Sequence, residues 1–173
     1  MDALTAIENF ASSIFNAGLN FLFVWGEFLG VVWMIILLSR GRADSPAPMT
    51  PGKFVVGMMV CAMLVSLPSL INAGGAQFGF SSTTFDAISY VEASTFGAAA
   101  GAANAVLSLA RLAGVGFALS GISLWRQSGL DGHTALSANE SVSRGTTKFV
   151  AGVLLVFTPQ VLNAIQASLG LAF

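Results

Sequence analysis

Glu27 and Arg111 are the ionisable side chains that lie deepest inside long apolar stretches of the chain. Glu27 lies 13 residues before Arg40, and Arg111 lies 15 residues before Arg126. At 1.5 Å per helical residue, their depths in two parallel helices differ by about 3 Å. Charged groups at such positions are costly and are usually paired. We therefore predict an intramembrane ion pair between Glu27 and Arg111, within one chain or between neighbouring chains.

Two roles are open for this pair. It could relay protons or ions, or expose charge to a water-filled channel, because intramembrane charges often line such paths. It could instead act as a lock that fixes the order of the helices. A relay normally needs more than one such pair, which favours the lock.

Catalytic groupings are scarce in the sequence. It contains no recognisable pair of catalytic carboxylates, no nucleophile beside a base and no phosphate-cradling loop. The single cysteine, Cys61, excludes an intrachain disulfide and a cysteine-based metal cluster, and the single histidine, His133, excludes a histidine-rich metal site. The sequence therefore predicts neither an enzyme nor a cofactor.

The composition is typical of a membrane protein. Of the 173 residues, 55% are hydrophobic and 9% are charged, and the mean hydropathy is +0.80. A soluble domain carries about 25% charged residues, so these charges cannot cover the surface of a soluble globule of this size. The net charge of -1 also excludes a strongly basic nucleic-acid-binding protein.

Four apolar stretches are long enough to cross a bilayer, which takes about 20 helical residues. They lack the period-two alternation of half-buried strands. No positively charged signal segment precedes the first stretch, so we expect a retained anchor rather than a cleaved leader. The predicted spans are Leu19–Leu38, Phe54–Ile71, Ala102–Trp125 and Phe149–Ile165.

Positive charge gathers in the two loops that join the first span to the second and the third to the fourth. Since cytoplasmic loops carry an excess of cations, we predict that both loops are cytoplasmic and that both termini lie on the far side. These side chains could act only as the topology signal, or they could contact lipid phosphates or a passing polyanion. The residues are Arg40, Arg42, Lys53, Arg126, Arg144 and Lys148.

The two halves of the sequence repeat each other in order. Gaps between matched segments differ by 4 residues at two places, close to one helical turn, so each difference roughly preserves the helix face. We predict a tandem duplication, with hairpin repeat 1 at residues 1–73, a linker at 74–81 and hairpin repeat 2 at 82–173. The matches include Asp2–Glu8 with Asp86–Glu92, Lys53–Gly57 with Lys148–Gly152, and Pro68–Ala73 with Pro159–Ala164.

The expected fold class is all-α, with four hydrophobic helices arranged as two tandem-duplicated parallel helical hairpins. A short amphipathic lead-in helix is expected before each hairpin, and Thr83 with Asp86 offers a capping box for the second one. The lead-ins are equally well explained as separate surface helices and as the outer turns of tilted spans. Their apolar positions include Leu4, Ile7, Phe10 and Ile14, and then Phe85, Ile88 and Val91.

Helix-breaking and small residues mark further positions. Pro68 and Pro159 lie inside the second and fourth spans, where each removes a helical hydrogen bond and should kink its helix. Glycines four residues apart bound the segments Gly26–Gly30 and Gly97–Gly101, and such pairs let helices approach closely in lipid. They could pack neighbouring subunits or the helices of one chain.

Two apolar helices joined by a short basic loop resemble the hairpin of the major pilins of conjugative type IV secretion systems. The length, the four spans and the segment ISLWRQSGLDGHTALS (122–137) are also similar to the small membrane proteins of I-type conjugation and Dot/Icm secretion, of the TraQ and DotE (IcmC) kind. Because the hairpin is present twice, the chain is larger than the usual pilin, and it lacks the long leader of many pilins.

This resemblance implies a structural membrane subunit of a bacterial conjugation or type IV secretion apparatus, which polymerises with itself into a pilus or channel. The basic loops would face the lumen or lipid headgroups, with phospholipid bound between subunits. The implied partners are further copies, other secretion-system membrane proteins and phospholipid. DNA or protein substrate would pass through, without sequence-specific nucleic-acid contact. The location would be the bacterial inner membrane, and an extracellular pilus after assembly.

Other functions fit the same sequence. The chain could be a static inner-membrane component of the secretion machine. It could also be a small transporter or channel that uses Glu27 and Arg111, or a phage-type membrane permeabiliser. A flux assay in liposomes with Glu27→Gln would separate transport from structure.

Overall fold

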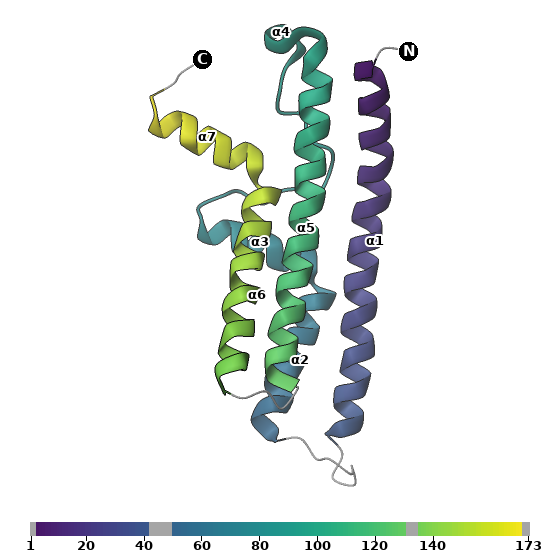
Figure 1. The fold of residues 1–173 in the computed structure, drawn as a ribbon, viewed down its shortest axis with the longest axis vertical. Coiled ribbons are helices and arrows are strands. Elements are labelled where there is room, and N and C mark those ends of the chain that lie inside the picture. The colour runs from purple at the N-terminus through teal and green to yellow at the C-terminus, as the bar shows by residue number, and fades with distance from the viewer. Residues whose placement is uncertain (1–2, 42–49, 131–134, 171–173) are drawn as a thin grey trace.

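The computed structural model describes residues 3–41, 50–130 and 135–170, and within these ranges the chain is helical and contains no strand (Figure 1). The prediction of an all-α fold is confirmed. In chain order the elements are α1 (Ala3–Arg40), α2 (Pro51–Val65), α3 (Leu67–Gln77), α4 (Ala93–Phe96), the 3-10 turn η1 (Gly97–Ala99), α5 (Ala100–Leu130), α6 (Ala135–Val156) and α7 (Thr158–Ser168).

Helices α1, α2, α5 and α6 form an upright bundle with α5 in the middle (Figure 1). Helix α5 packs against α1, α2 and α6, and α1 also packs against α2. The C-terminal ends of α1 and α5 lie at the same end of the bundle as the N-terminal ends of α2 and α6. This is the antiparallel order that two consecutive hairpins require.

Two helices are long and apolar enough to cross a membrane alone. They are Thr5–Arg40 of α1 and Ala100–Ser128 of α5. The pair α2 and α3 and the pair α6 and α7 qualify only when each is taken together, and they are bent by 94° and 80°. The described residues therefore contain two candidate spans, or four if each bent pair is one span, in agreement with a membrane protein.

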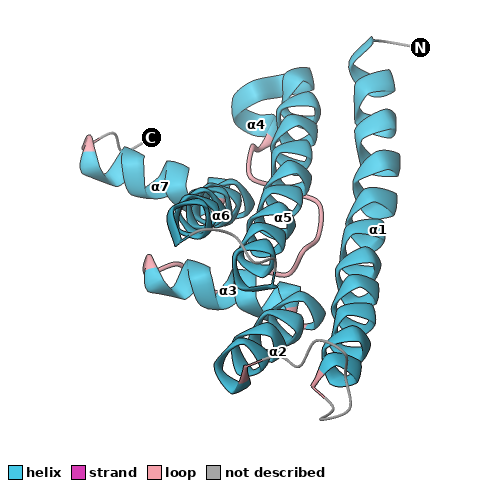
Figure 2. Cartoon of the chain, turned by 60° about the horizontal axis from the view of Figure 1, so that its bottom comes forward, coloured by secondary structure: helices cyan, strands magenta, loops and turns pink. Residues whose placement is uncertain are grey.

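Both breaks coincide with the prolines that we expected to kink their helices. Pro68 is the second residue of α3, and Pro159 is the second residue of α7. A proline has no N–H to continue the preceding helix, but it fits the first turn of a new one. The result is a sharp turn rather than a gentle kink, and α3 and α7 both project away from α1 (Figure 2).

The two predicted lead-in helices have different outcomes. The first is the outer part of α1, which is continuous from Ala3, so it forms no separate surface helix. The second prediction was wrong, because residues 80–92 contain no helix. Thr83 does not cap a helix there; its backbone N–H donates to Asn72 Oδ1 at 3.1 Å. Tertiary hydrogen bonds thus override the local amphipathic pattern. Residues 74–77, predicted as linker, belong to α3.

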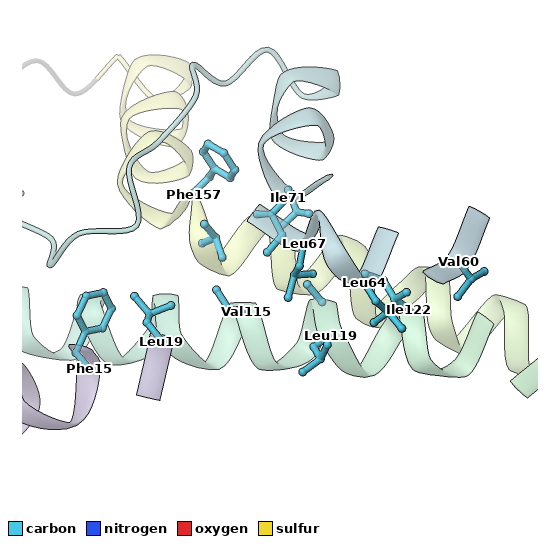
Figure 3. Close-up of a cluster of buried hydrophobic side chains, with 13 residues drawn as sticks. Phe15, Leu19, Val60, Leu64, Leu67, Ile71, Val115, Leu119, Ile122 and Phe157 are labelled. Carbon is cyan, nitrogen blue, oxygen red and sulfur yellow. The ribbon is translucent and has the colours of Figure 1, made fainter. Parts of the chain in front are cut away.

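The buried core contains side chains from both predicted hairpins (Figure 3). Residues of α1, α2 and α3 meet residues of α5 and α6 in one cluster, so the two halves of the chain share a single core. Burial of large apolar side chains of this kind is worth about 1.5–3 kcal/mol each. The cluster includes Phe15, Leu64, Leu67, Ile71, Val115, Ile122 and Phe157.

Helices α5 and α6 approach each other closely at two pairs of glycines. A Cβ atom on Gly114 would lie 2.7 Å from the carbonyl oxygen of Gly152, and one on Gly121 would lie 2.6 Å from the carbonyl oxygen of Gly145. The two glycines on each helix are seven residues apart, about two turns, so they lie on one face. Small residues allow such backbone contact in a membrane helix pair.

The two glycine pairs predicted from the sequence pack differently in the structure. The Gly26–Gly30 pair packs within the same chain: a Cβ atom on Gly26 would lie 3.3 Å from Leu119 Cδ1 of α5, and one on Gly30 would lie 2.7 Å from Val65 Cγ2 of α2. Gly97 has φ +56° and begins η1, so it forms no helical pair with Gly101. Gly101 instead lies against the carboxyl group of Glu8, which leaves no space for a Cβ atom.

Candidate functional site

Arg111 binds three backbone carbonyl groups inside the bundle. It lies on α5 and is 7% exposed. Its Nε donates to the carbonyl of Val156 at 3.3 Å, and its Nη1 donates to the carbonyls of Thr84 at 3.3 Å and Asp86 at 2.5 Å. Val156 is the last residue of α6, so the guanidinium satisfies a carbonyl at the helix break. Arg111 therefore holds the end of α6 and the loop at residues 80–92 together.

The neighbouring carbonyl at the break, that of Leu155, is satisfied locally. In an unbroken helix it would accept from residue 159, but Pro159 has no N–H. The Thr158 hydroxyl donates to this carbonyl at 2.6 Å instead. Side chains therefore replace helical hydrogen bonds at the break.

The predicted ion pair between Glu27 and Arg111 does not form within the chain. Glu27 is exposed on α1 and makes no hydrogen bond or ion pair within the described ranges. Arg111 faces the loop and the end of α6. In the structure Gly18 lies against Leu112 and Arg126 lies over Trp33, so Arg111 is level with about residue 17 of α1, roughly 15 Å from the level of Glu27. The intrachain prediction failed because it assumed that Arg40 and Arg126 lie at the same depth. Pairing between neighbouring chains stays a prediction.

Side chains of α5 fix the backbone of the loop at residues 80–92. The Asn104 Oδ1 accepts from the N–H groups of Tyr90 at 2.9 Å and Val91 at 2.8 Å, and its Nδ2 donates to the carbonyl of Val91 at 2.9 Å. The Ser108 Oγ accepts from the N–H of Ile88 at 2.9 Å. Together with Arg111, these bonds give the loop partners that regular secondary structure would otherwise supply.

The first part of the same loop is held by α3 and α7. Asn72 exchanges two hydrogen bonds with the Thr83 backbone, at 3.2 and 3.1 Å. Gln160 likewise exchanges two with the Ser81 backbone, both at 2.9 Å. The bent helices, the loop and α5 therefore form one hydrogen-bonded unit, which we call the polar cap.

The sequence carries a signal for part of this unit. Asn104, Ser108 and Arg111 stand at i, i+4 and i+7 of an apolar helix, and polar side chains on one face of a membrane helix indicate a polar partner. We predicted a role for Arg111 only. The partners are backbone groups of a loop, and no pattern of side chains reveals those.

Two pockets flank the loop. One of about 250 Å³ lies beside Arg111, Tyr90 and Pro159, and one of about 220 Å³ lies beside Glu8 and Phe15. Both pockets are smaller than ordinary small-molecule sites, which occupy about 300–1,000 Å³. Within the described part of the chain, no group of three or more His, Cys, Asp or Glu side chains could hold a metal ion.

Two of the three predicted basic residues of the first loop lie at the end of the bundle opposite the N-terminus, where α1 ends and α2 begins (Figure 1). Arg40 ends α1, Lys53 lies in the first turn of α2, and both are exposed. Arg42 lies outside the described residues. The Arg126 guanidinium of α5 lies 3.5 Å from the ring centroid of Trp33, a cation–π contact that joins α5 to α1.

The two predicted cations of α6 have local partners. Arg144 forms an ion pair with Glu140 at 2.6 Å, one helical turn away, with both side chains largely exposed. The Lys148 Nζ donates to Ser120 Oγ of α5 at 3.3 Å. Both cations remain exposed, so they are still accessible to groups outside the chain, such as lipid phosphates.

Asn104→Ala is expected to release the loop without unfolding the bundle, because one side chain provides three bonds to residues 90 and 91. Hydrogen exchange in detergent should show loss of protection at these residues. The control is Asn9→Ala, since the exposed Asn9 side chain binds none of the loop. Unchanged protection at residues 90 and 91 would contradict this role of Asn104.

Comparison with known proteins adds no family to this description. No protein-family model, curated protein or solved structure matches the chain. The functional argument therefore depends on the residues and contacts described above.

Proposed function

We propose that this protein is a structural, non-enzymatic membrane subunit that assembles with further copies of itself. The setting suggested by its resemblance is a bacterial conjugation or type IV secretion apparatus, with the chain as a pilin-like subunit of a pilus or channel. Other secretion-system membrane proteins and phospholipid would be its further partners.

The exposure of α1 carries this proposal. Of its membrane-length segment, 17% is buried, against 44% for the corresponding segment of α5. Exposed large apolar side chains occur along the whole helix, and they are 40–64% exposed. In a membrane this side of α1 is covered by lipid or by another helix, and its exposed polar side chains, Ser13, Asn20 and Glu27, favour another helix over lipid. The apolar side chains include Phe10, Phe21, Val24, Phe28 and Ile35.

The topology and the duplication belong to the same proposal. The basic end of the bundle would lie in the cytoplasm, toward lipid headgroups or a lumen, and the termini on the other side. Each half of the chain has a long apolar helix followed by a helix pair that breaks beside a proline, with bends of 94° and 80°. This parallel supports a tandem-duplicated hairpin.

We do not propose transport through Glu27 and Arg111. Arg111 is occupied by three carbonyls, and Glu27 lies on the exposed side of a different helix. Among the described residues, no series of hydrogen bonds or ion pairs links the two side chains.

Self-assembly can be measured on the purified full chain. In mild detergent we expect an oligomer by native mass spectrometry, and a monomer over the whole concentration range would contradict the proposal. Shearing cells then separates the two structural roles. Filaments that contain the chain would support a pilin, whereas retention in the inner membrane would indicate a static component.

Topology is tested with single cysteines in a Cys61→Ser background. Ser39→Cys near the basic end and Ser168→Cys near the C-terminus are both at exposed positions. In intact cells an impermeant maleimide should modify residue 168 but reach residue 39 only after permeabilisation. The reverse pattern would overturn the cytoplasmic assignment of the basic end.

A further inference from the structure

Glu27 lies on the outer edge of the bundle. Its side chain is exposed on α1 and makes no hydrogen bond or ion pair with the described residues. Gly18 of α1 lies against α5, and Glu27 follows it by nine residues, or about two and a half helical turns. Glu27 therefore points away from α5. A charged group on such a surface is costly in a bilayer and is usually paired.

Lys148 of α6 lies at the same level of the bundle as Glu27. Gly26 of α1 lies against Leu119 of α5, so Glu27 is level with about residue 120. The Lys148 Nζ donates to Ser120 Oγ at 3.3 Å, which fixes its ammonium group at this level. The carboxylate of α1 and the ammonium group of α6 therefore lie at about the same depth.

This depth suits a carboxylate partner for Lys148 better than a lipid phosphate. Glu27 lies 13 residues before Arg40, so its level is about 20 Å from the end of α1. An ammonium group has three N–H donors, and Lys148 uses one of them on Ser120. The exposed lysine therefore has two donors left for a group outside its own chain. Arg111, by contrast, is 7% exposed and bound to three carbonyls.

One chain does not bring the two opposite charges together. Helices α1 and α6 both pack on α5 and lie on opposite sides of it (Figures 1 and 2). Glu27 points away from α5, so the whole width of α5 separates it from Lys148. A second copy placed beside the first has no such barrier.

We propose that Glu27 of one copy forms an ion pair with Lys148 of the next copy, with the outer side of α1 packed beside α6 of its neighbour. Copies inserted in one membrane share an orientation, so the two side chains meet at equal depth without a shift of either copy along the membrane normal. The inference rests on the proposed self-assembly and names the surfaces where copies meet.

The contact joins two different edges of the molecule. Each copy offers α1 to one neighbour and α6 to the other, so the interface is heterologous. An interface of this kind generates a closed ring, or a helical filament where the rotation does not close, rather than a two-fold dimer. The pair therefore specifies how a ring or a filament of this chain is connected.

Carbodiimide crosslinking tests the contact, because the reagent joins a carboxylate to an amine only where the two touch. In membranes that hold isotopically heavy and light chains together, we expect a crosslink between Glu27 of one isotope and Lys148 of the other. The chain has one further lysine, Lys53, in the first turn of α2, and it should not link to Glu27. Glu27→Gln is the matched control and should remove the crosslink.

Charge reversal tests the same contact by assembly. Glu27→Lys and Lys148→Glu should each lose the oligomer in native mass spectrometry, because each sets like charges against each other and leaves them unpaired. The double variant should regain it. A mixture of the two single variants should also assemble, because each contact between the two kinds of chain again joins opposite charges. The matched control, Glu27→Lys with Lys53→Glu, should stay dissociated.

The outcomes separate this inference from the proposed function. An oligomer that survives both single reversals, or that crosslinks residues 27 and 148 only within one isotope or not at all, overturns the pair and leaves self-assembly standing. Failure of both the double variant and the mixture to reassemble also overturns the pair, because the loss would then lie in the folding of each chain. A native protein that is monomeric in membranes and in detergent overturns both proposals.

Discussion

Alanine at Gly114 or Gly152 is expected to separate α5 from α6 and to lower the free energy of unfolding by about 1–3 kcal/mol, as overpacking does in a tight interior. A Cβ atom on Gly114 would lie 2.7 Å from the Gly152 carbonyl oxygen, and one on Gly152 would lie 2.5 Å from the Gly114 carbonyl oxygen. Both clashes are with backbone, which no change of rotamer relieves. Thermal unfolding of the detergent-solubilised protein measures the loss.

Gly116→Ala is the matched control for this effect. It lies on the same helix two residues away, and its Cβ atom would meet nothing nearer than Leu22 Cδ1 at 3.9 Å. Alanine is a better helix former than glycine by about 1 kcal/mol, so this variant should be slightly stabilised. The difference between the two alanine variants isolates the close contact. Equal midpoints for Gly114→Ala and Gly116→Ala would contradict the packing of α5 on α6.

The long apolar helices could be predicted from the sequence, because apolar length is a local property. The stretches around Glu27 and Arg111 are continuous helices in the structure, as expected. The second and fourth stretches break at Ser66 and Phe157 instead, just before Pro68 and Pro159. A proline predicts where a helix is weak, but the size of the bend depends on what stabilises the turned segment. Here that is a hydrogen-bonded loop from elsewhere in the chain.

The polar cap could not be predicted in the same way. The segment around Ile88 has helical spacing of its apolar residues, yet it forms no helix, and Asn104 and Ser108 bind its backbone N–H groups. Local spacing describes one segment at a time, whereas these bonds join residues 13 to 20 positions apart. The charge of Arg111 made it a candidate in the sequence. Its partners could not be predicted, because they are backbone carbonyls, which every residue type carries.

Arg111→Met is expected to be among the most destabilising single changes in the chain. A hydrogen bond from a charged donor contributes about 1.5–3 kcal/mol, and this side chain donates to the carbonyls of Val156, Thr84 and Asp86. Methionine fills similar volume but leaves these carbonyls without a donor. The end of α6 and residues 80–92 should separate from α5, which faster hydrogen exchange and proteolysis in that loop would detect.

Two further variants separate the geometry of Arg111 from its charge. Arg144→Met removes an arginine whose side chain is 70% exposed in its ion pair with Glu140, and such pairs contribute about 0–1 kcal/mol, so stability should stay near that of the native chain. Arg111→Lys keeps the positive charge but loses the planar fork of donors that reaches three carbonyls. If Arg111 holds the polar cap, lysine should fail to restore protection of the loop. Full rescue by lysine would instead show that any positively charged donor at this position is enough, and it would contradict the role of the planar fork.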